Sequence, residues 1–279
     1  FKGQNIRLAF AAVTDSSDVT SFFVDDVLIG GSGNLGVDAI SASFAHACVS
    51  SSGGAQCWGF YPGVGNGTTT NSTTAVQSIP NVSGVTGVST RGNGTCAVMN
   101  GGVQCWGYRT RGSIDGNAVT PSSTPVQIIA PANGVLSVAA GEGSGCAVLA
   151  GGVKCWGGNS NGELGDGTNV DSAAPVQTIV AGSAATKVSA AGSTTCAIVN
   201  GGVRCWGFNA SGQVGNGTTA TSAVPVQTIA ASTGATDISA GVHHSCAVLN
   251  GGVQCWGNNG SGQLGNGTLI QSTVPVQAI

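Results

Sequence analysis

Ten cysteines are the residues of this sequence whose chemistry follows most directly from their spacing. They form five Cys-x8-Cys pairs: Cys48 with Cys57, Cys96 with Cys105, Cys146 with Cys155, Cys196 with Cys205, and Cys246 with Cys255. Pairs of this kind can form disulfides, remain as buried thiols in a reducing compartment, or hold a metal ion. Zinc sites favour cysteines about two to four residues apart and several converging ligands, so a metal is the weakest of the three interpretations.

The residues between the two cysteines of a pair favour disulfides. In the last pair, Asn250-Gly251 is a strong signal for a two-residue hairpin turn. With that turn, Cys246 faces Cys255 as a non-hydrogen-bonded pair, whose closer Cα atoms can accept a cross-strand disulfide. The same number of residues separates the cysteines in the other four pairs, so the same turn places them opposite each other. We therefore predict five structural disulfides and an oxidising location, either extracellular or on the cell surface.

Side-chain alternation in the same hairpin predicts a sheet that is covered on both sides. Cys246, Val248 and Val253 point to one face, whereas Ala247 and Trp256 point to the other. Both faces are largely apolar, which is typical of a sheet packed between two neighbouring sheets.

The histidines give no indication of catalysis. His46 and His244 occupy equivalent positions, two residues before a cysteine pair, where Gly94, Ser144 and Thr194 stand elsewhere. A position that accepts glycine is not expected to hold an essential ligand, so we interpret both histidines as structural or surface residues.

The acidic side chains are scattered over loops and form no active-site constellation. Asp166 and Asp171 resemble part of a calcium loop, but Asn66, Asn216 and Asn266 replace Asp166 at equivalent positions, which indicates a turn residue. The phosphate-binding pattern Gly-x-x-x-x-Gly-Lys-Ser/Thr does not occur. We predict a protein that is not an enzyme, with no catalytic residue, no metal site and no cofactor.

The bulk composition argues against two further classes of protein. The 8 Lys+Arg and 11 Asp+Glu give a formal net charge of −3, so the chain lacks the basic surface that nucleic-acid binding requires. No run of about 18 apolar residues occurs, so no membrane insertion is expected. The 48 glycines and 7% charged residues are typical of many short strands joined by tight turns.

An internal repeat organises the chain, because successive tryptophans are 48, 50, 50 and 50 residues apart at Trp58, Trp106, Trp156, Trp206 and Trp256. Each unit contains short apolar runs bounded by Gly, Asn, Ser or Thr, which predicts three or four strands. Such a unit cannot bury both faces of its sheet alone, whereas units arranged around an axis can. We predict an all-β fold, a β-propeller of antiparallel blades with repeats at 34–81, 82–131, 132–181, 182–231 and 232–279.

One segment of the repeat resembles a known family. The pattern Gly-x-Asn-x-x-Gly-Gln-Leu-Gly, from Gly257 to Gly265, is similar to the repeat of the regulator of chromosome condensation family. Related strings start at Gly207 and Gly157, whereas residues 107–115 depart from the pattern and the first repeat has lost it. The paired cysteines and Val-Gln-Cys-Trp-Gly resemble the bacterial, extracellular branch. The resemblance implies a propeller that usually has seven blades, so the five repeats are expected to be part of such a ring.

The first 33 residues match no repeat. Residues 6–13 and 19–29 are predicted strands, and Ser21 to Val27 looks like the last strand of a jelly-roll module. We expect residues 1–33 to be the C-terminal end of a truncated β-sandwich, joined by the linker 30–33 to the propeller.

Loops that vary while the scaffold repeats are the expected place of binding. The loops after each tryptophan differ between repeats and should lie on one rim. We predict partner contacts at Phe60, Tyr61, Tyr108, Arg109, Arg111, Asn159, Glu163 and Phe208. The favoured function is a non-catalytic binding module of a secreted or cell-surface bacterial protein, monomeric within a larger multidomain chain, with a protein or glycan partner.

Two alternatives stay open at this point. The resemblance implies, as one of them, a regulator that promotes nucleotide exchange on a small GTPase. The other is an accessory domain of a secreted polysaccharide-active enzyme, or a secreted propeller that inhibits an enzyme.

Alkylation before and after reduction tests the disulfide prediction. Intact mass should show no alkylated cysteine in the native protein and ten after reduction and unfolding, because a paired sulfur cannot react with the reagent. Ten free thiols in carefully handled protein would contradict both the disulfides and the inferred location.

Overall fold

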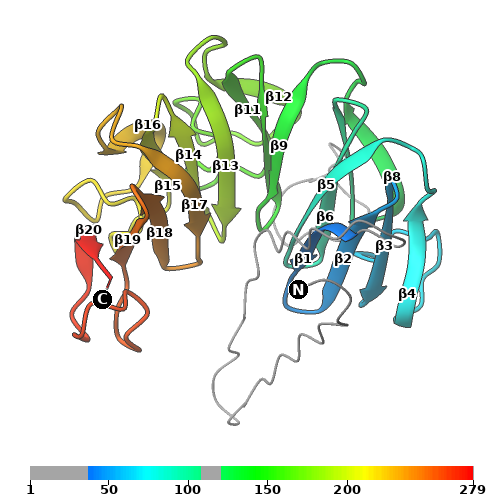
Figure 1. Ribbon diagram of the computed structural model, residues 1–279, viewed down its shortest axis with the longest axis horizontal. Coiled ribbons are helices and arrows are strands. Elements are labelled where there is room, and N and C mark those ends of the chain that lie inside the picture. The colour runs from blue at the N-terminus through cyan, green and yellow to red at the C-terminus, as the bar shows by residue number, and fades with distance from the viewer. Residues whose placement is uncertain (1–36, 108–120, 279) are drawn as a thin grey trace.

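The computed structural model describes residues 37–107 and 121–278, which form five four-stranded antiparallel sheets. The sheets follow one another in chain order along an arc (Figure 1). They have the β-propeller arrangement that the repeat predicts, and each sheet is one blade. The described part of the chain contains no long apolar helix of the kind that spans a membrane. The predicted β-sandwich strands and linker of residues 1–33 lie outside the described residues, and the seven-bladed ring stays a prediction.

Within each blade the four strands pair in chain order, and the first strands of successive blades lie side by side. The first blade contains β1 (Val37–Ala42), β2 (His46–Ser51), β3 (Gly54–Gly59) and β4 (Ser72–Ile79). The second contains β5 (Val85–Arg91), β6 (Gly94–Met99), β7 (Gly102–Gly107) and β8 (Ser122–Ile129). The third contains β9 (Val135–Ala140), β10 (Ser144–Leu149), β11 (Gly152–Gly157) and β12 (Ser172–Ile179). The fourth contains β13 (Ala185–Ala191), β14 (Thr194–Val199), β15 (Gly202–Gly207) and β16 (Ser222–Ile229). The fifth contains β17 (Ala235–Ala240), β18 (His244–Leu249), β19 (Gly252–Gly257) and β20 (Ser272–Gln277).

The hairpin between the second and third strands of each blade has the predicted register. In the fifth blade, the cysteine of β18 lies opposite the cysteine of β19, and the turn residues Asn250 and Gly251 both have positive φ, as a two-residue hairpin requires. The same opposition of the two cysteines recurs in the other four blades.

Every cysteine is bonded within its own blade, and the two Cα atoms of each pair are 4.0–4.1 Å apart. The five disulfides join Cys48 to Cys57, Cys96 to Cys105, Cys146 to Cys155, Cys196 to Cys205, and Cys246 to Cys255. All ten predicted disulfide cysteines, and their pairing, are thus confirmed. The physical reason is the register, which brings the two Cβ atoms of each pair together across the hairpin.

Both faces of the inner blades are buried, as the alternation of apolar residues predicts. Between the fourth and fifth blades, one core cluster joins Ile198 and Val203 of the fourth blade to Ala247 and Trp256 of the fifth. Equivalent clusters fill the other junctions. The core is therefore a series of sheet-to-sheet layers, which explains why so few residues of the chain are charged.

Among the described residues, a buried hydrogen bond joins three of the tryptophans to the blade before them. The indole N–H of Trp206 donates to the backbone carbonyl of Glu163 at 2.8 Å, and Thr195 donates to the same carbonyl at 3.3 Å. Trp106 and Trp256 make the same bond to the first and fourth blades, also at 2.8 Å. Each of these carbonyls lies in the loop between the third and fourth strands. At these three junctions, the tryptophan of one blade therefore fixes the third-to-fourth-strand loop of the preceding blade.

Glycine is required where this loop meets the tryptophan. Gly165 has a φ of +66°, and a Cβ added there would lie 2.7 Å from the indole nitrogen of Trp206. Gly215 stands in the same relation to Trp256. A side chain would clash with the ring and would also strain the left-handed backbone. This accounts for the last glycine of the repeated loop pattern.

Replacing Trp206 by Phe should lower the free energy of unfolding by about 1–3 kcal/mol, because one buried hydrogen bond is lost and a void is left. Trp58 provides a matched control, since it is only half-buried and the described residues offer its indole no hydrogen-bond acceptor. Trp58→Phe should cost less than about 1 kcal/mol. Urea denaturation measures both changes, and equal losses would argue against the indole bond as a source of stability.

Candidate interaction surface

Two sets of loops share one rim of the propeller. Because neighbouring strands of a blade are antiparallel, the loop from the first to the second strand and the loop from the third to the fourth emerge at the same end. The hairpin turns and the links between blades emerge at the opposite end. Of the variable loops that we expected to bind a partner, those that the structure describes therefore lie on a common rim, and the loop that follows Trp106 lies outside the described residues.

A buried asparagine shapes the loop between the third and fourth strands. The Nδ2 of Asn159 donates to the carbonyls of Thr168 and Val170 at 3.0 and 3.1 Å, and its Oδ1 accepts from the N–H of Leu164 at 2.9 Å. Asn209 organises the loop of the fourth blade in the same way. Asn159 is completely buried, so it lies inside the loop and not on the partner-facing surface where the sequence analysis placed it.

Glu163 is also buried, and its carboxylate accepts hydrogen bonds from the backbone and side-chain nitrogens of Asn161 at 2.7 and 3.1 Å. Gln213 replaces it in the fourth blade and accepts the N–H of Ser211 at 2.9 Å. Glu163 was predicted to contact a partner, but in the structure its buried side chain supports the loop instead. Recurrence of Asn and Glu/Gln at fixed loop positions was the signal that these residues shape the loop.

Three exposed or half-buried aromatic residues lie on this rim in the first blade. Phe60 and Tyr61 follow β3 with ring centroids 5.7 Å apart, and Phe44 lies between β1 and β2. The two loops are joined by the N–H of Phe60, which donates to the carbonyl of Ala45 at 2.8 Å. Phe44 is 67% exposed and Phe60 is 39% exposed, while Tyr61 is half-buried. We call Phe44, Phe60 and Tyr61 the aromatic patch.

Phe44 was not among the residues predicted from sequence. Its counterparts in the other repeats are Gly92, Glu142, Gly192 and Val242. A large aromatic residue at a position otherwise occupied by glycine, glutamate or valine was the available signal. Only the fold places this loop next to the one that carries Phe60.

The remaining predicted contacts fall elsewhere. Phe208 is half-buried in the fourth blade, where its backbone carbonyl accepts the Thr194 hydroxyl at 2.7 Å. It lies on the same rim as the aromatic patch but in a different blade. Tyr108, Arg109 and Arg111 lie outside the described residues.

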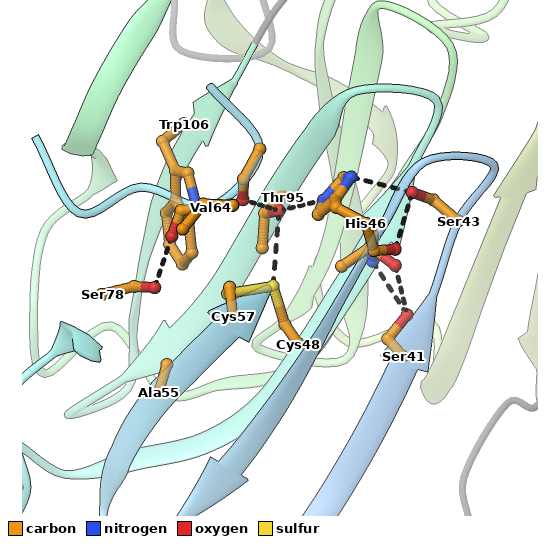
Figure 2. The surroundings of a disulfide bond; sticks show 12 residues. Ser41, Ser43, His46, Cys48, Ala55, Cys57, Val64, Ser78, Thr95 and Trp106 are labelled. Carbon is orange, nitrogen blue, oxygen red and sulfur yellow. Dashed lines mark hydrogen bonds between the residues drawn. A yellow bond between two sulfur atoms is a disulfide. The ribbon is translucent and has the colours of Figure 1, made fainter. Parts of the chain in front are cut away.

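A buried histidine supports the loops that carry the aromatic patch. Figure 2 shows the His46 ring between Ser43 and Thr95, close to the first disulfide. Its Nε2 lies 2.7 Å from the Thr95 hydroxyl and its Nδ1 lies 2.9 Å from the Ser43 hydroxyl. Thr95 donates to the carbonyl of Gly63 at 3.0 Å, so its oxygen accepts the Nε2 proton and Nδ1 is left as the acceptor.

The His46 ring also fills space that a side chain occupies in other blades. A Cβ at Gly63 would lie 2.7 Å from the ring, whereas the equivalent Glu163 has a full side chain. The third blade, which carries Glu163, has the small Ser144 in place of His46. Burial lowers the pKa of His46 to about 4, so the ring is neutral near pH 7 and acts as a structural group, as we predicted.

His244, the counterpart of His46, lies in a different setting. It is half-buried, and burial together with the neighbouring His243 lowers its pKa. Within residues 37–107 and 121–278, no three His, Cys, Asp or Glu side chains come together in a group that could hold a metal ion.

The first strands of the blades border an axial cavity of about 470 Å³. Its walls carry hydroxyl groups, among them Ser41, Thr86 and Ser189. Lys187 in the wall forms an ion pair with Asp237 at 2.7 Å. The cavity is polar and none of the described residues that line it is aromatic, so its chemistry differs from that of the aromatic patch.

The sequence matches one type of repeat. Residues 150–198 and 200–248 match the model of the regulator of chromosome condensation (RCC1) repeat, and residues 235–263 match a second model of the same description. No curated protein matches the chain.

Several solved structures have a similar fold. Human WBSCR16 has a TM-score of 0.75 at 21% identity, over 88% of this chain and 67% of that one. Prp20p from Saccharomyces cerevisiae has a TM-score of 0.75 at 17% identity, over 88% of this chain and 64% of that one. The ectodomain of the receptor kinase CR4 from Physcomitrella patens has a TM-score of 0.50 at 21% identity, over 81% and 53%. This chain thus spans about two thirds or less of each of these, and the likeness shows the fold, a β-propeller of the RCC1 type.

The burial of His46 predicts a loss of stability in acid. Below pH 6.5 the unfolded chain protonates this histidine, while the folded protein does not until about pH 4. The free energy of unfolding should therefore fall as the pH drops through this window, by roughly 3 kcal/mol in total from this residue. His46→Ser, which copies Ser144, should remove that part of the pH dependence, and His243→Ser at an exposed position should leave it unchanged. Denaturant titrations at several pH values give the comparison, and parallel curves for wild type and His46→Ser would refute the assignment.

Proposed function

We propose that this chain, which contains repeats of the regulator of chromosome condensation family in residues 150–263, is a non-catalytic module that binds another protein through the aromatic patch. One observation supports this most directly. Of the four Phe and Tyr residues in the described part of the chain, three are Phe44, Phe60 and Tyr61, and they lie in two joined loops of one rim. The fourth, Phe208, is half-buried on the same rim.

Aromatic side chains in such a place favour a protein partner. They are enriched in protein interfaces, where they bury large areas with little loss of conformational entropy. The hydrogen bonds of His46 and the bond between Phe60 and Ala45 hold the loops that carry them in place. These loops therefore lose little conformational freedom on binding. Prp20p, which shares the fold, has been crystallised with Kap60 bound to it. That example supports the proposal of a protein partner.

The assignment as a non-catalytic module rests on how the reactive side chains are used. His46 is neutral and bonded on both ring nitrogens, and Asp166 accepts the N–H and hydroxyl of Thr168 within a turn. Lys187 is paired with Asp237. Each group therefore has a structural partner, which is unlike the arrangement of an active site.

The five disulfides support a location outside the reducing cytosol, so we propose an extracellular or cell-surface protein. The same feature disfavours regulation of an intracellular GTPase. A glycan is not expected in the cavity, because its described lining residues include no aromatic ring on which a sugar could stack.

Truncating the patch tests the proposal. Phe44→Ala/Phe60→Ala should weaken affinity capture of a partner from the extracellular fraction of the source organism at least about tenfold, because two central anchors are lost. Val82→Ala/Val180→Ala is the matched control, since both valines are exposed at the opposite rim. Thermal unfolding should be unchanged in both variants.

The alternatives predict different results. Capture that is unaffected by Phe44→Ala/Phe60→Ala would place binding away from the patch. Binding to a glycan array, sensitive to the same two substitutions, would replace the protein partner by a glycan. Release of bound nucleotide from a small GTPase would restore the exchange-factor alternative.

A further inference from the structure

The fourth strand of each blade is its outermost strand, and among the described residues no further strand pairs with its outer side. This holds for β8, β12 and β16, whose blades have described neighbours on both sides. The packing of one blade on the next therefore does not cover these outer edges. Figure 1 shows β4 in the same outer position in the first blade.

A proline stands at one fixed position of this outer strand in four of the five blades. The four residues are Pro125, Pro175, Pro225 and Pro275, whereas the first blade has Ala75. All five outer strands pair with the third strand in the same register. Because proline has no N–H, the ladder of the four blades uses no donor at this position. By the shared register, the first blade does not need the N–H of Ala75 for its own sheet.

The pairing of β4 with β3 explains why this donor is spare. Between the pairs Cys57–Val76 and Gly59–Ser72, three residues of β4 (73–75) lie opposite one residue of β3. Such a bulge leaves backbone groups without a partner in the ladder. All three residues are exposed. The donor that the other four blades lack is thus present at an exposed bulge of the first blade.

Unpaired strand edges are places where another extended chain can add, and proline and charged side chains are the usual protection against it. The prolines of the other four outer strands fit this role. The first blade has neither kind of protection, because β4 has no proline and residues 60–79 contain no charged side chain. Its outer edge is therefore the one that can accept a further strand.

This open edge begins beside the aromatic patch. Asn71, the residue before β4, accepts the N–H of Tyr61 through its side-chain oxygen at 3.2 Å. At the other end of β4, the side-chain nitrogen of Gln77 donates to the carbonyls of Ala55 and Ile79. The stretch that remains open is therefore residues 73–77, and it is continuous with the patch.

We propose that the partner of the aromatic patch adds a short, extended, uncharged segment to β4 as a fifth strand of the first blade. The inference rests on the proposed function, because it concerns the same protein partner. Backbone hydrogen bonds to groups such as the Ala75 N–H supply affinity, and the patch selects the side chains at the end of the segment. The segment is uncharged because residues 60–79 offer no opposite charge to pair with a buried one.

Ala75→Pro blocks the edge and should preserve the fold, because it copies the residue of the four other blades. Ala75→Val is the matched control, since it enlarges the side chain but keeps the N–H. The probe is a phage-displayed library of random linear peptides selected on the wild-type protein. The selected peptides should bind Ala75→Pro at least about tenfold more weakly than wild type, and Ala75→Val about as well as wild type. Calorimetric titration with the synthetic peptides measures the affinities, and near-ultraviolet circular dichroism checks the fold of both variants.

The variant Phe44→Ala/Phe60→Ala separates this inference from the proposed function. Peptides that are weakened by it and by Ala75→Pro support the added strand. Peptides weakened by the patch variant alone would leave the proposed function standing and overturn the added strand, and peptides that depend on neither would overturn both. Failure to select any peptide would also overturn it. A wild-type dimer that Ala75→Pro dissociates in analytical ultracentrifugation would assign the edge to a second copy of the chain instead.

Amide hydrogen exchange gives a second measurement on the unmodified chain. The Ala75 amide should exchange rapidly in the free protein and at least about tenfold more slowly when a selected peptide is bound, because the new strand accepts its hydrogen bond. Slow exchange at Ala75 in the free protein would show that the edge is already covered. Either that result, or exchange unchanged by the peptide, would contradict the added strand.

Discussion

The hydrogen bond from a buried tryptophan to a loop carbonyl of the preceding blade is the contact on which the rest of the structure depends. It fixes where one blade stands relative to the next, and it fixes the loop that reaches the functional rim. The bond needs a glycine such as Gly165 beside the ring, a left-handed turn, and a buried asparagine such as Asn159 that holds the loop in shape. Much of the repeated sequence therefore serves this one junction.

The first blade shows what happens where the repeat is broken. It has a shortened loop, glycine in place of Glu163, and a buried histidine that fills the space left by that change. The same blade carries the aromatic patch. A departure from the repeat lowers stability little where a neighbouring side chain fills the space, as the His46 ring does beside Gly63. These departures give the first blade a surface that the other described blades lack. Function is best sought at such departures, since the repeated positions are already used for packing.

Stacking also explains the composition. A blade with two apolar faces is stable only between neighbours, so the inner blades bury nearly all of both faces. The disulfide then restrains each hairpin from within, where the short strands offer few other contacts.

The sequence by itself determined the class of fold, the repeat, the hairpin register and all five disulfides, because these depend on local spacing. A fixed number of residues around Asn250-Gly251 is enough to place Cys246 opposite Cys255. The tertiary structure decided which loop residues are exposed. Asn159 and Glu163 are variable-loop residues in the sequence, yet their hydrogen bonds turn them inward. Phe44 joins Phe60 only because two loops distant in the chain meet at one rim, and no local pattern encodes that proximity.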